Sequence, residues 1–243
     1  MPRGIPPEMI TQTTAFYDTI DTAAGIDRVA SAAAVAAFVR DEMPRAHTML
    51  EIGCGTGAHL ATFAERGFVA RGIEADIKGV ALARSRTPEI VVDPADLTTF
   101  DLGERFDAIV SLGGSTAFAR LPARLDAMLA RVAAHVEPTG IVLIEPYAIA
   151  AAAYRPGTLE SIFVDEPDLK IARMCLSKQM GKIGILDFHY LVASLRGVER
   201  FFERHEIGLF TDAIYETAFA NANLTFARVA LAAGRGAYVG RPR

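Results

Sequence analysis

The sequence has little cysteine, no excess of basic residues and no long apolar run, and each absence excludes a class of protein. Two cysteines, Cys54 and Cys175, are too few for a disulfide framework, so a reducing cytoplasm is expected. A formal net charge of −4 argues against a nucleic-acid binder. The most apolar run, 29–39, is shorter than the roughly 20 residues of a membrane span, and the N-terminus has no apolar signal core. We therefore expect a soluble, cytoplasmic protein with no nucleic-acid or membrane partner.

The five histidines are scattered, and no Cys–His pair has the spacing of metal ligands, so no metal is expected. Of the 243 residues 51% are hydrophobic and 22% are charged. Such a balance is typical of one large domain with a sizeable core and excludes a disordered chain.

The first half of the chain alternates strand-like and helix-like segments. Helices are predicted at 27–42, 58–66, 76–86 and 121–136. Strands are predicted at 47–52, 68–74, 90–92, 106–112 and, after a turn at 137–140, at 141–145. This alternation predicts a doubly wound, mostly parallel, Rossmann-like sheet with helices on both faces.

The second half breaks the alternation. Four strands without long helices between them are predicted at 161–164, 169–178, 182–193 and 198–207, followed by a helix at 211–221 and a hairpin at 224–231 and 237–240. We therefore predict an α/β fold with a seven-stranded sheet and an inserted antiparallel β subdomain. Residues 1–146 and 208–243 would form the core, and 147–207 the insertion.

A glycine-rich segment, Leu50–Gly57 (LEIGCGTG), joins a predicted strand to a predicted helix. Glycines allow a tight turn and a close ligand approach, and the helix start offers unpaired N–H groups. The spacing is not the G-x-G-x-x-G of dinucleotide-binding proteins, and Glu51 would attract a cationic group but be a poor neighbour for a pyrophosphate. The pattern therefore disfavours an NAD-type oxidoreductase, while a tight turn without a ligand is the structural alternative.

Two more acids follow at the ends of the next two strands. Glu74 ends the second strand, where a carboxylate typically accepts hydrogen bonds from a ribose diol. Asp96 follows the third strand and could accept from an adenine amino group. Each alone could be a solvated loop residue. Three acids at successive strand ends of one sheet edge indicate a nucleoside site.

The series LEIGCGTG, RGIEAD, the Asp96-Leu97 loop and FDAIVSL resembles the motifs of class I S-adenosylmethionine-dependent methyltransferases, and the resemblance covers nearly the whole chain. It implies S-adenosyl-L-methionine as cofactor and S-adenosyl-L-homocysteine as product. By this likeness the glycines cradle the methionine part, Glu51 lies near its amino group, Glu74 takes the ribose, and Asp96 with Leu97 takes the adenine. The implied cofactor-binding residues are Tyr17, Glu51, Gly53, Cys54, Gly55, Gly57, Glu74, Ala75, Asp96, Leu97 and Ser111. Tyr17 could instead pack a cap helix, and Cys54 is expected to be a small buried filler.

The second half resembles one subgroup, the bacterial N-methyltransferases that methylate the amino group of nucleotide-linked deoxyaminosugars in antibiotic pathways. The likeness rests on the stretches 188–193, 198–210, 215–219, 234–236 and 239–240. It implies a small-molecule amine acceptor and a homodimer. Two stretches depart from the subgroup: 114–118 reads GSTAF where a Tyr or His usually ends the segment, and 147–150 reads YAIA instead of a Trp-containing run. N- or O-methylation of a non-sugar natural product therefore stays an alternative, as does a catalytically inactive binding module.

Methyl transfer to an amine requires that the protonated amine first lose a proton. On a period of two, Asp187 and His189 share one face of the strand 182–193, and we predict that this face meets the substrate because the other looks buried. The catalytic candidates are His189, His205 and Tyr147. The substrate-binding candidates are Ser115, Phe118, Tyr147 and Arg173, the last for an anionic group. Packing roles are the alternative for each.

Overall fold

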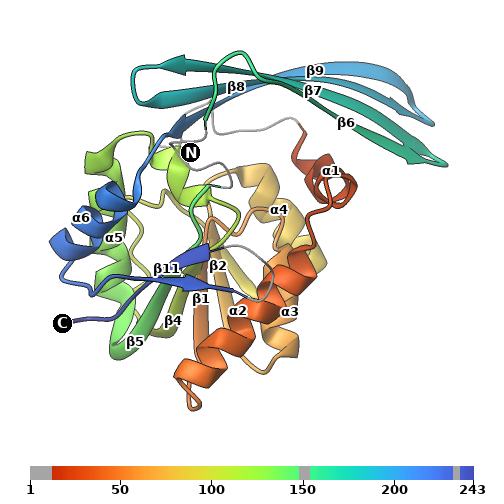
Figure 1. Ribbon diagram of the computed structural model, residues 1–243. Helices are drawn as coiled ribbons and strands as arrows, with labels where there is room; N and C mark the ends of the chain where they lie inside the picture. Colours follow the sequence, from red (N-terminus) through yellow and green to blue (C-terminus); the bar gives the residue numbers. More distant parts are fainter. Residues whose placement is uncertain (1–12, 148–153, 232–235) are drawn as a thin grey trace.

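The computed structural model describes residues 13–147, 154–231 and 236–243. A seven-stranded sheet with helices on both faces forms the body of the molecule, and a separate four-stranded sheet lies across one end of it (Figure 1). The predicted α/β class, seven-stranded sheet and antiparallel insertion are confirmed. The stretch 148–150 and the hairpin turn at 234–235, both noted in the sequence, lie outside the described residues.

The larger sheet has the strand order β10-β11-β5-β4-β1-β2-β3. The strands from β1 to β5 pair in parallel, whereas β11 is antiparallel to both β5 and β10. Their bounds are β1 Thr48–Ile52, β2 Val69–Glu74, β3 Val91–Pro94, β4 Phe106–Ser111, β5 Val136–Ile144, β10 Ala227–Ala230 and β11 Gly236–Gly240. Because parallel strands end on the same side, the carboxyl ends of β1, β2 and β3 bring the three predicted acids to one edge.

One predicted boundary was wrong. Residues 137–140 were expected to form a turn, but β5 begins at Val136 and includes them. Phe106 pairs with Val136 and Ala108 with Ile141, so the register between β4 and β5 shifts at this point. The extra residues of β5 form an irregularity in the ladder, which lets a strand contain a proline and a glycine without ending.

Five α-helices flank the larger sheet: α2 Arg28–Glu42, α3 Ala58–Glu65, α4 Ile77–Arg86, α5 Pro122–His135 and α6 Asp212–Asn221. The side chains of Asp27, Asp76 and Thr211 each accept a hydrogen bond from a backbone N–H of the first turn, which fixes where three of these helices start. Among the described residues, no single helix is long and apolar enough to span a membrane, and only the bent pair Thr14–Ala23 and Arg28–Glu42 passes on length and composition.

Two apolar clusters hold the helices to the sheet. Helices α2, α3 and α4 pack on one face, and α5 and α6 pack on the other. Alternate residues of β1 point to opposite clusters, Met49 to the first and Leu50 and Ile52 to the second. Burial on both faces explains why these strands read as continuous apolar runs.

The smaller sheet consists of β6 Leu159–Glu166, β7 Leu169–Met180, β8 Ile183–Ser194 and β9 Gly197–Gly208, all antiparallel. We call the face that carries Leu186, Phe188 and Tyr190 the inner face, because these side chains pack with Ile20 of α1 (Tyr17–Ala23) and Ala117 of the 3-10 helix η3 (Ser115–Ala119). The opposite face, which we call the outer face, points away from the body of the molecule (Figure 1).

Candidate active site

The glycine loop has open space at Gly55 and a tight contact at Gly57. Gly55 and Gly57 both have positive φ angles, +54° and +74°. A Cβ at Gly57 would lie 2.8 Å from the Cβ of Ala83, so glycine is needed for α3 to start this close to α4. A Cβ at Gly55 would meet nothing within 4 Å. The loop therefore presents open backbone at Gly55, where a ligand can approach closely.

Glu74 ends β2 beside this loop. Its Oε2 accepts a hydrogen bond of 2.8 Å from the backbone N–H of Gly55, and its Oε1 accepts one of 2.8 Å from Asp76 N–H. Burial raises the pKa of Glu74 above its ordinary value, and the two N–H donors offset part of the rise. Each carboxylate oxygen keeps a further lone pair, so Glu74 is fixed in place and can still accept from the two hydroxyls of a ribose.

Asp96 is held by its own loop. Its Oδ1 accepts from the N–H and the hydroxyl of Thr98 at 2.7 and 2.6 Å, and its Oδ2 accepts from Arg124 at 3.3 Å. Burial acts to raise the pKa of Asp96, but these hydrogen bonds and the Arg124 charge outweigh it and hold the pKa below the ordinary value. Asp96 is therefore an ionised, oriented acceptor next to Leu97, and its role in adenine binding stays a prediction.

Three further residues predicted for the site are Ser111, Ser115 and Ala75. Ser111, at the end of β4, is fully buried and shares a 2.9 Å hydrogen bond with Ser115. Ser115 also donates to the backbone carbonyl of Leu112 at 3.1 Å, so its hydroxyl is engaged in structure on the cofactor side. Ala75 is buried between Glu74 and Asp76. Ser115 was predicted to bind substrate; the structure places it against the glycine loop, where a Cβ at Gly53 would lie 2.7 Å from it, and the role stays a prediction.

A buried pair lies below the first glycine. Nδ1 of His59, in the first turn of α3, lies 2.7 Å from Oε1 of Glu51. Both side chains are almost fully buried, and Glu51 Oε2 has no hydrogen-bond partner among the described residues. Glu51 was predicted from its place before the glycines. The sequence analysis counted His59 among the scattered histidines. The glycine loop joins β1 to α3, and this connection brings His59 next to the end of β1.

The N-terminal segment covers the site. Tyr17 begins α1, and its hydroxyl donates to Oε2 of Glu203 on β9 at 3.3 Å. Thr14 donates to Asp76 at 2.7 Å, and Thr56 of the glycine loop donates to Asp18 at 2.8 Å. The segment therefore joins the cofactor edge of the larger sheet to the inner face of the smaller one, in keeping with Tyr17 as a residue of the cover.

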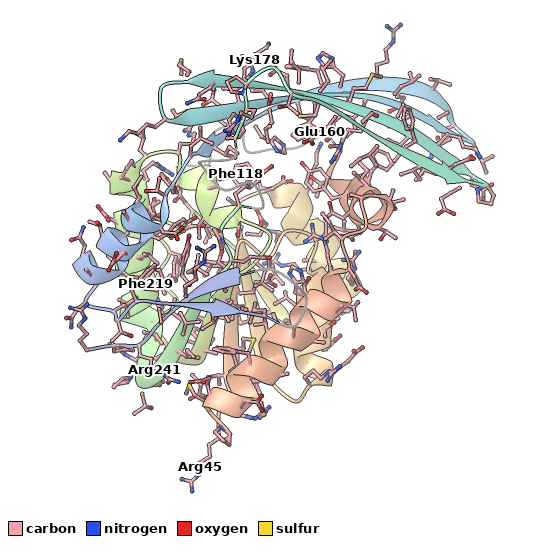
Figure 2. The ribbon with its side chains drawn as sticks, viewed as in Figure 1. Arg45, Phe118, Glu160, Lys178, Phe219 and Arg241 are labelled. Carbon is pink, nitrogen blue, oxygen red and sulfur yellow. The ribbon has the colours of Figure 1, made fainter. Side chains whose placement is uncertain are left out.

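A cavity of about 220 Å³ lies between α1, the ends of β4 and β5, and the inner face. Its lining includes Tyr147, Glu160 and Arg173, of which Tyr147 and Arg173 were predicted to face the acceptor and Glu160 was not predicted. Glu160 is seen on the inner side of the smaller sheet in Figure 2. The Arg173 guanidinium lies 5.1 Å from the ring centre of Phe188. Among the described residues, neither Arg173 nor Glu160 forms an ion pair.

The cysteines and Tyr147 stay protonated at neutral pH. Burial, with the nearby Glu51 charge, raises the pKa of Cys54 well above its usual value, in keeping with its prediction as a filler. Burial raises the pKa of Cys175, which lines the cavity, to about 11. Burial also raises the pKa of Tyr147 well above the ordinary range. The Tyr147 hydroxyl can therefore donate a hydrogen bond but is a poor proton acceptor.

The predicted orientation of β8 was wrong. Asp187 and His189 lie on the outer face, where Asp187 pairs with Lys178 and Arg204 and His189 is exposed beside Phe202. The buried apolar face is the one that meets the body and the cavity, because it packs on α1 and η3. His189 is therefore not placed to handle a proton at the cavity.

His205 is on the inner face but outside the cavity lining. Its ring meets the rings of Phe188 and Phe118 edge-on at 5.0 and 5.5 Å, and its Nε2 is buried without a hydrogen-bond partner among the described residues. Figure 2 shows Phe118 on the body side, below the smaller sheet. Phe118 is 38% exposed and packs through its ring, in line with an apolar residue at this position.

The residues of this edge fit S-adenosylmethionine. The open side of Gly55 leaves room for a ligand, Glu74 and Asp96 offer acceptors of the kind that a ribose and an adenine need, and the unpartnered Glu51 oxygen suits an ammonium group. Glu160 and Glu145, which the sequence analysis missed, also line the adjacent cavity. Glu145 accepts from Gly113 N–H at 2.7 Å and so fixes the ends of β4 and β5 together.

Comparison with known proteins gives the family. A family model described as a methyltransferase domain matches residues 49–140. Over 229 residues the chain is 36% identical to dTDP-3-amino-3,6-dideoxy-alpha-D-glucopyranose N,N-dimethyltransferase of Streptomyces fradiae, covering 93% of this chain and 89% of the relative.

Two solved structures agree. The crystal structure of Streptomyces venezuelae DesVI is similar with a TM-score of 0.88 at 32% identity, covering 96% of this chain and 99% of that one. SAM-bound CalS10, an amino pentose methyltransferase from Micromonospora echinaspora involved in calicheamicin biosynthesis, gives 0.83 at 33% identity, covering 93% and 96%. The chain belongs to the S-adenosylmethionine-dependent methyltransferase family that includes the dTDP-aminosugar N,N-dimethyltransferases, and S-adenosylmethionine is its cofactor.

Proposed function

We propose that the enzyme N-methylates the amino group of a nucleotide-linked deoxyaminosugar, with a dTDP sugar as the first candidate and two successive methyl additions. The observation that carries this proposal is the cavity beside the cofactor edge, which offers one guanidinium and one carboxylate without ion-pair partners among the described residues. Arg173 is suited to the diphosphate of a nucleotide sugar and Glu160 to its ammonium group. The names of relatives at 32–36% identity support the same substrate class.

The reaction is an in-line displacement in which bound S-adenosylmethionine supplies an activated methyl group. The chain has to align the amine and exclude water. The cover formed by α1 and the inner face encloses the site from two sides. We assign to Glu160 the acceptance of the proton that the substrate ammonium must lose before attack, because this carboxylate lines the cavity and has no ion-pair partner among the described residues.

A second candidate is N- or O-methylation of a natural product that is not a sugar. Phe118 favours it, because its ring packs against His205 and offers no polar contact at a position where the sugar enzymes usually carry Tyr or His. Apolar aromatic surface at the acceptor side would suit a less polar substrate.

A turnover assay separates the two candidates. The enzyme is incubated with S-adenosylmethionine and either dTDP-linked 3-amino- and 4-amino-deoxysugars or a panel of non-sugar amines and alcohols, and products are followed by mass spectrometry. We expect one and then two methyl additions on a dTDP-aminosugar. Turnover confined to the non-sugar panel would overturn the sugar assignment, and binding of S-adenosylhomocysteine without turnover on any acceptor would indicate an inactive binding module.

We further propose that the enzyme acts as a homodimer in the cytoplasm and that 147–207 is its substrate and dimer region. The outer face supports self-association, because it exposes apolar side chains of all four strands, among them Leu159, Phe163, Met174, Leu191 and Phe202. A groove of about 770 Å³ runs beside several of them. Both cysteines are free, which agrees with a reducing compartment.

A further inference from the structure

The buried pair of Glu51 and His59 is the part of the cofactor edge that no motif explains. Glu51 ends β1, and His59 lies in the first turn of α3, so the glycine loop connects the two. An ionised carboxylate can only accept hydrogen bonds. We assign the proton of the 2.7 Å contact to Nδ1 of His59, which then donates to Oε1 of Glu51.

The second oxygen of the Glu51 carboxylate accepts no hydrogen bond from the described residues. This oxygen, Oε2, is buried. A buried carboxylate oxygen without a donor is costly, so a ligand that supplies a donor there would be stabilised. His59 lines the cavity, so the buried pair lies directly behind the cavity wall.

A second atom without a hydrogen bond, a donor, belongs to a residue of the cavity wall. Arg28 lines the cavity, and its Nε is buried without a hydrogen bond to any described residue, at 3.7 Å from Asp18 Oδ1. Beside the buried Glu51 oxygen there is thus an N–H without a hydrogen bond, on a guanidinium that already pairs with Asp18 and Asp21. The amino-acid end of S-adenosylmethionine carries an ammonium and a carboxylate, and it needs both an acceptor and a donor.

We propose that His59 is a positioning residue for the cofactor: it holds Glu51 by Oε1 so that Oε2 meets the ammonium of the methionine part. A rigid acceptor loses less freedom when it binds than one that must first be ordered. This role of His59 concerns the cofactor alone and does not depend on the acceptor that the enzyme methylates.

Two ligands test this role without any turnover. S-adenosylhomocysteine carries the amino-acid end, and 5′-methylthioadenosine shares the nucleoside and thioether but lacks that end. Their affinities are measured by calorimetry for the wild type, His59→Leu, His59→Asn and Glu51→Gln. His59→Leu removes the donor to Glu51. The side-chain amide of His59→Asn can replace the Nδ1–H donor, and His47→Leu is the control at an exposed histidine.

We expect His59→Leu to lose at least tenfold in affinity for S-adenosylhomocysteine and to bind 5′-methylthioadenosine within twofold of the wild type. We expect His59→Asn to regain most of the loss, and His47→Leu to bind both ligands normally. Equal losses for both ligands, an unchanged S-adenosylhomocysteine affinity, or an Asn variant no better than Leu would each overturn the proposal. If His59→Leu does not fold, Glu51→Gln decides, since the proposal requires the same selective loss there.

Discussion

At the scale of single residues, we expect Glu74 to make cofactor binding depend on pH. Ribose hydroxyls donate best to the ionised carboxylate, and burial raises the pKa of Glu74 above its ordinary value. The affinity for the cofactor is therefore highest above this raised pKa and declines as the pH falls through it. We expect the calorimetric affinity for S-adenosylhomocysteine to begin falling at a higher pH than an exposed glutamate would cause.

Glu74→Gln tests this assignment at neutral pH as well. Hydrogen bonds to a charged group contribute about 1.5–3 kcal/mol, so the variant should bind S-adenosylhomocysteine roughly ten- to a hundredfold more weakly. The part of the pH dependence that Glu74 causes should vanish. Glu65→Gln, at an exposed position of α3, should change neither property. A Glu74→Gln profile that still falls as in the wild type would assign the pH dependence to another group.

The sequence predicted correctly the location of residues that is set by their position in the chain. Gly55, Glu74 and Asp96 stand at strand ends, and the order of strands alone brings them to one edge. His59 and Glu160 could not be found this way. His59 becomes a partner of Glu51 only because α3 folds back on β1. From the sequence alone Glu160 looks like a solvated charge. It lines the cavity only because the inner face of the smaller sheet lies against the body of the molecule.

At the scale of elements, the period of two grouped the β8 side chains correctly but did not say which group faces inward. Both faces carry apolar residues, and Asp187 is itself buried on the outer face. The Arg204 guanidinium and the Lys178 ammonium bind its carboxylate. A strand whose charge is buried by neighbouring strands cannot be oriented from its own pattern, because the partners are distant in sequence.

The same ion cluster stabilises the smaller sheet above acidic pH. Hydrogen bonds from Arg204 and Lys178 lower the pKa of Asp187 to about 2 from 3.8. A carboxyl whose pKa is lowered in the folded state adds stability above its unfolded pKa and loses it as the pH falls toward the folded one. Since both cations are about half exposed, we expect Asp187→Asn to cost about 1–2 kcal/mol at pH 7.

Thermal unfolding measures this contribution. Asp187→Asn should lower Tm by roughly 2–8 °C at pH 7, and the gap to the wild type should shrink between pH 4 and pH 3. Asp165→Asn is the matched control, because Asp165 pairs with Lys170 on the same sheet but is exposed and should leave Tm unchanged. A gap as large at pH 3 as at pH 7 would mean that the loss comes from packing and not from charge.

At the scale of the whole molecule, the outer face is large enough for a stable dimer. Strands β7, β8 and β9 have 12 residues each, which makes the face about 40 Å long, and four strands make it about 15–19 Å wide. About 600–800 Å² per protomer follows, close to the roughly 800 Å² per partner of a standard interface. No described segment of the chain covers this face (Figure 1).

A second copy of the chain is the occupant that we expect, since two such faces can pack as the two sheets of a sandwich. Analytical ultracentrifugation of the wild type should give twice the 26.1 kDa of one chain. The double variant Leu191→Asp/Phe202→Asp places buried charges in the interface and should sediment as a monomer that still binds S-adenosylhomocysteine. Val29→Asp, at an exposed apolar residue of α2, should remain a dimer. A monomeric wild type would refute the homodimer, and a dimeric double variant would move its interface to another face.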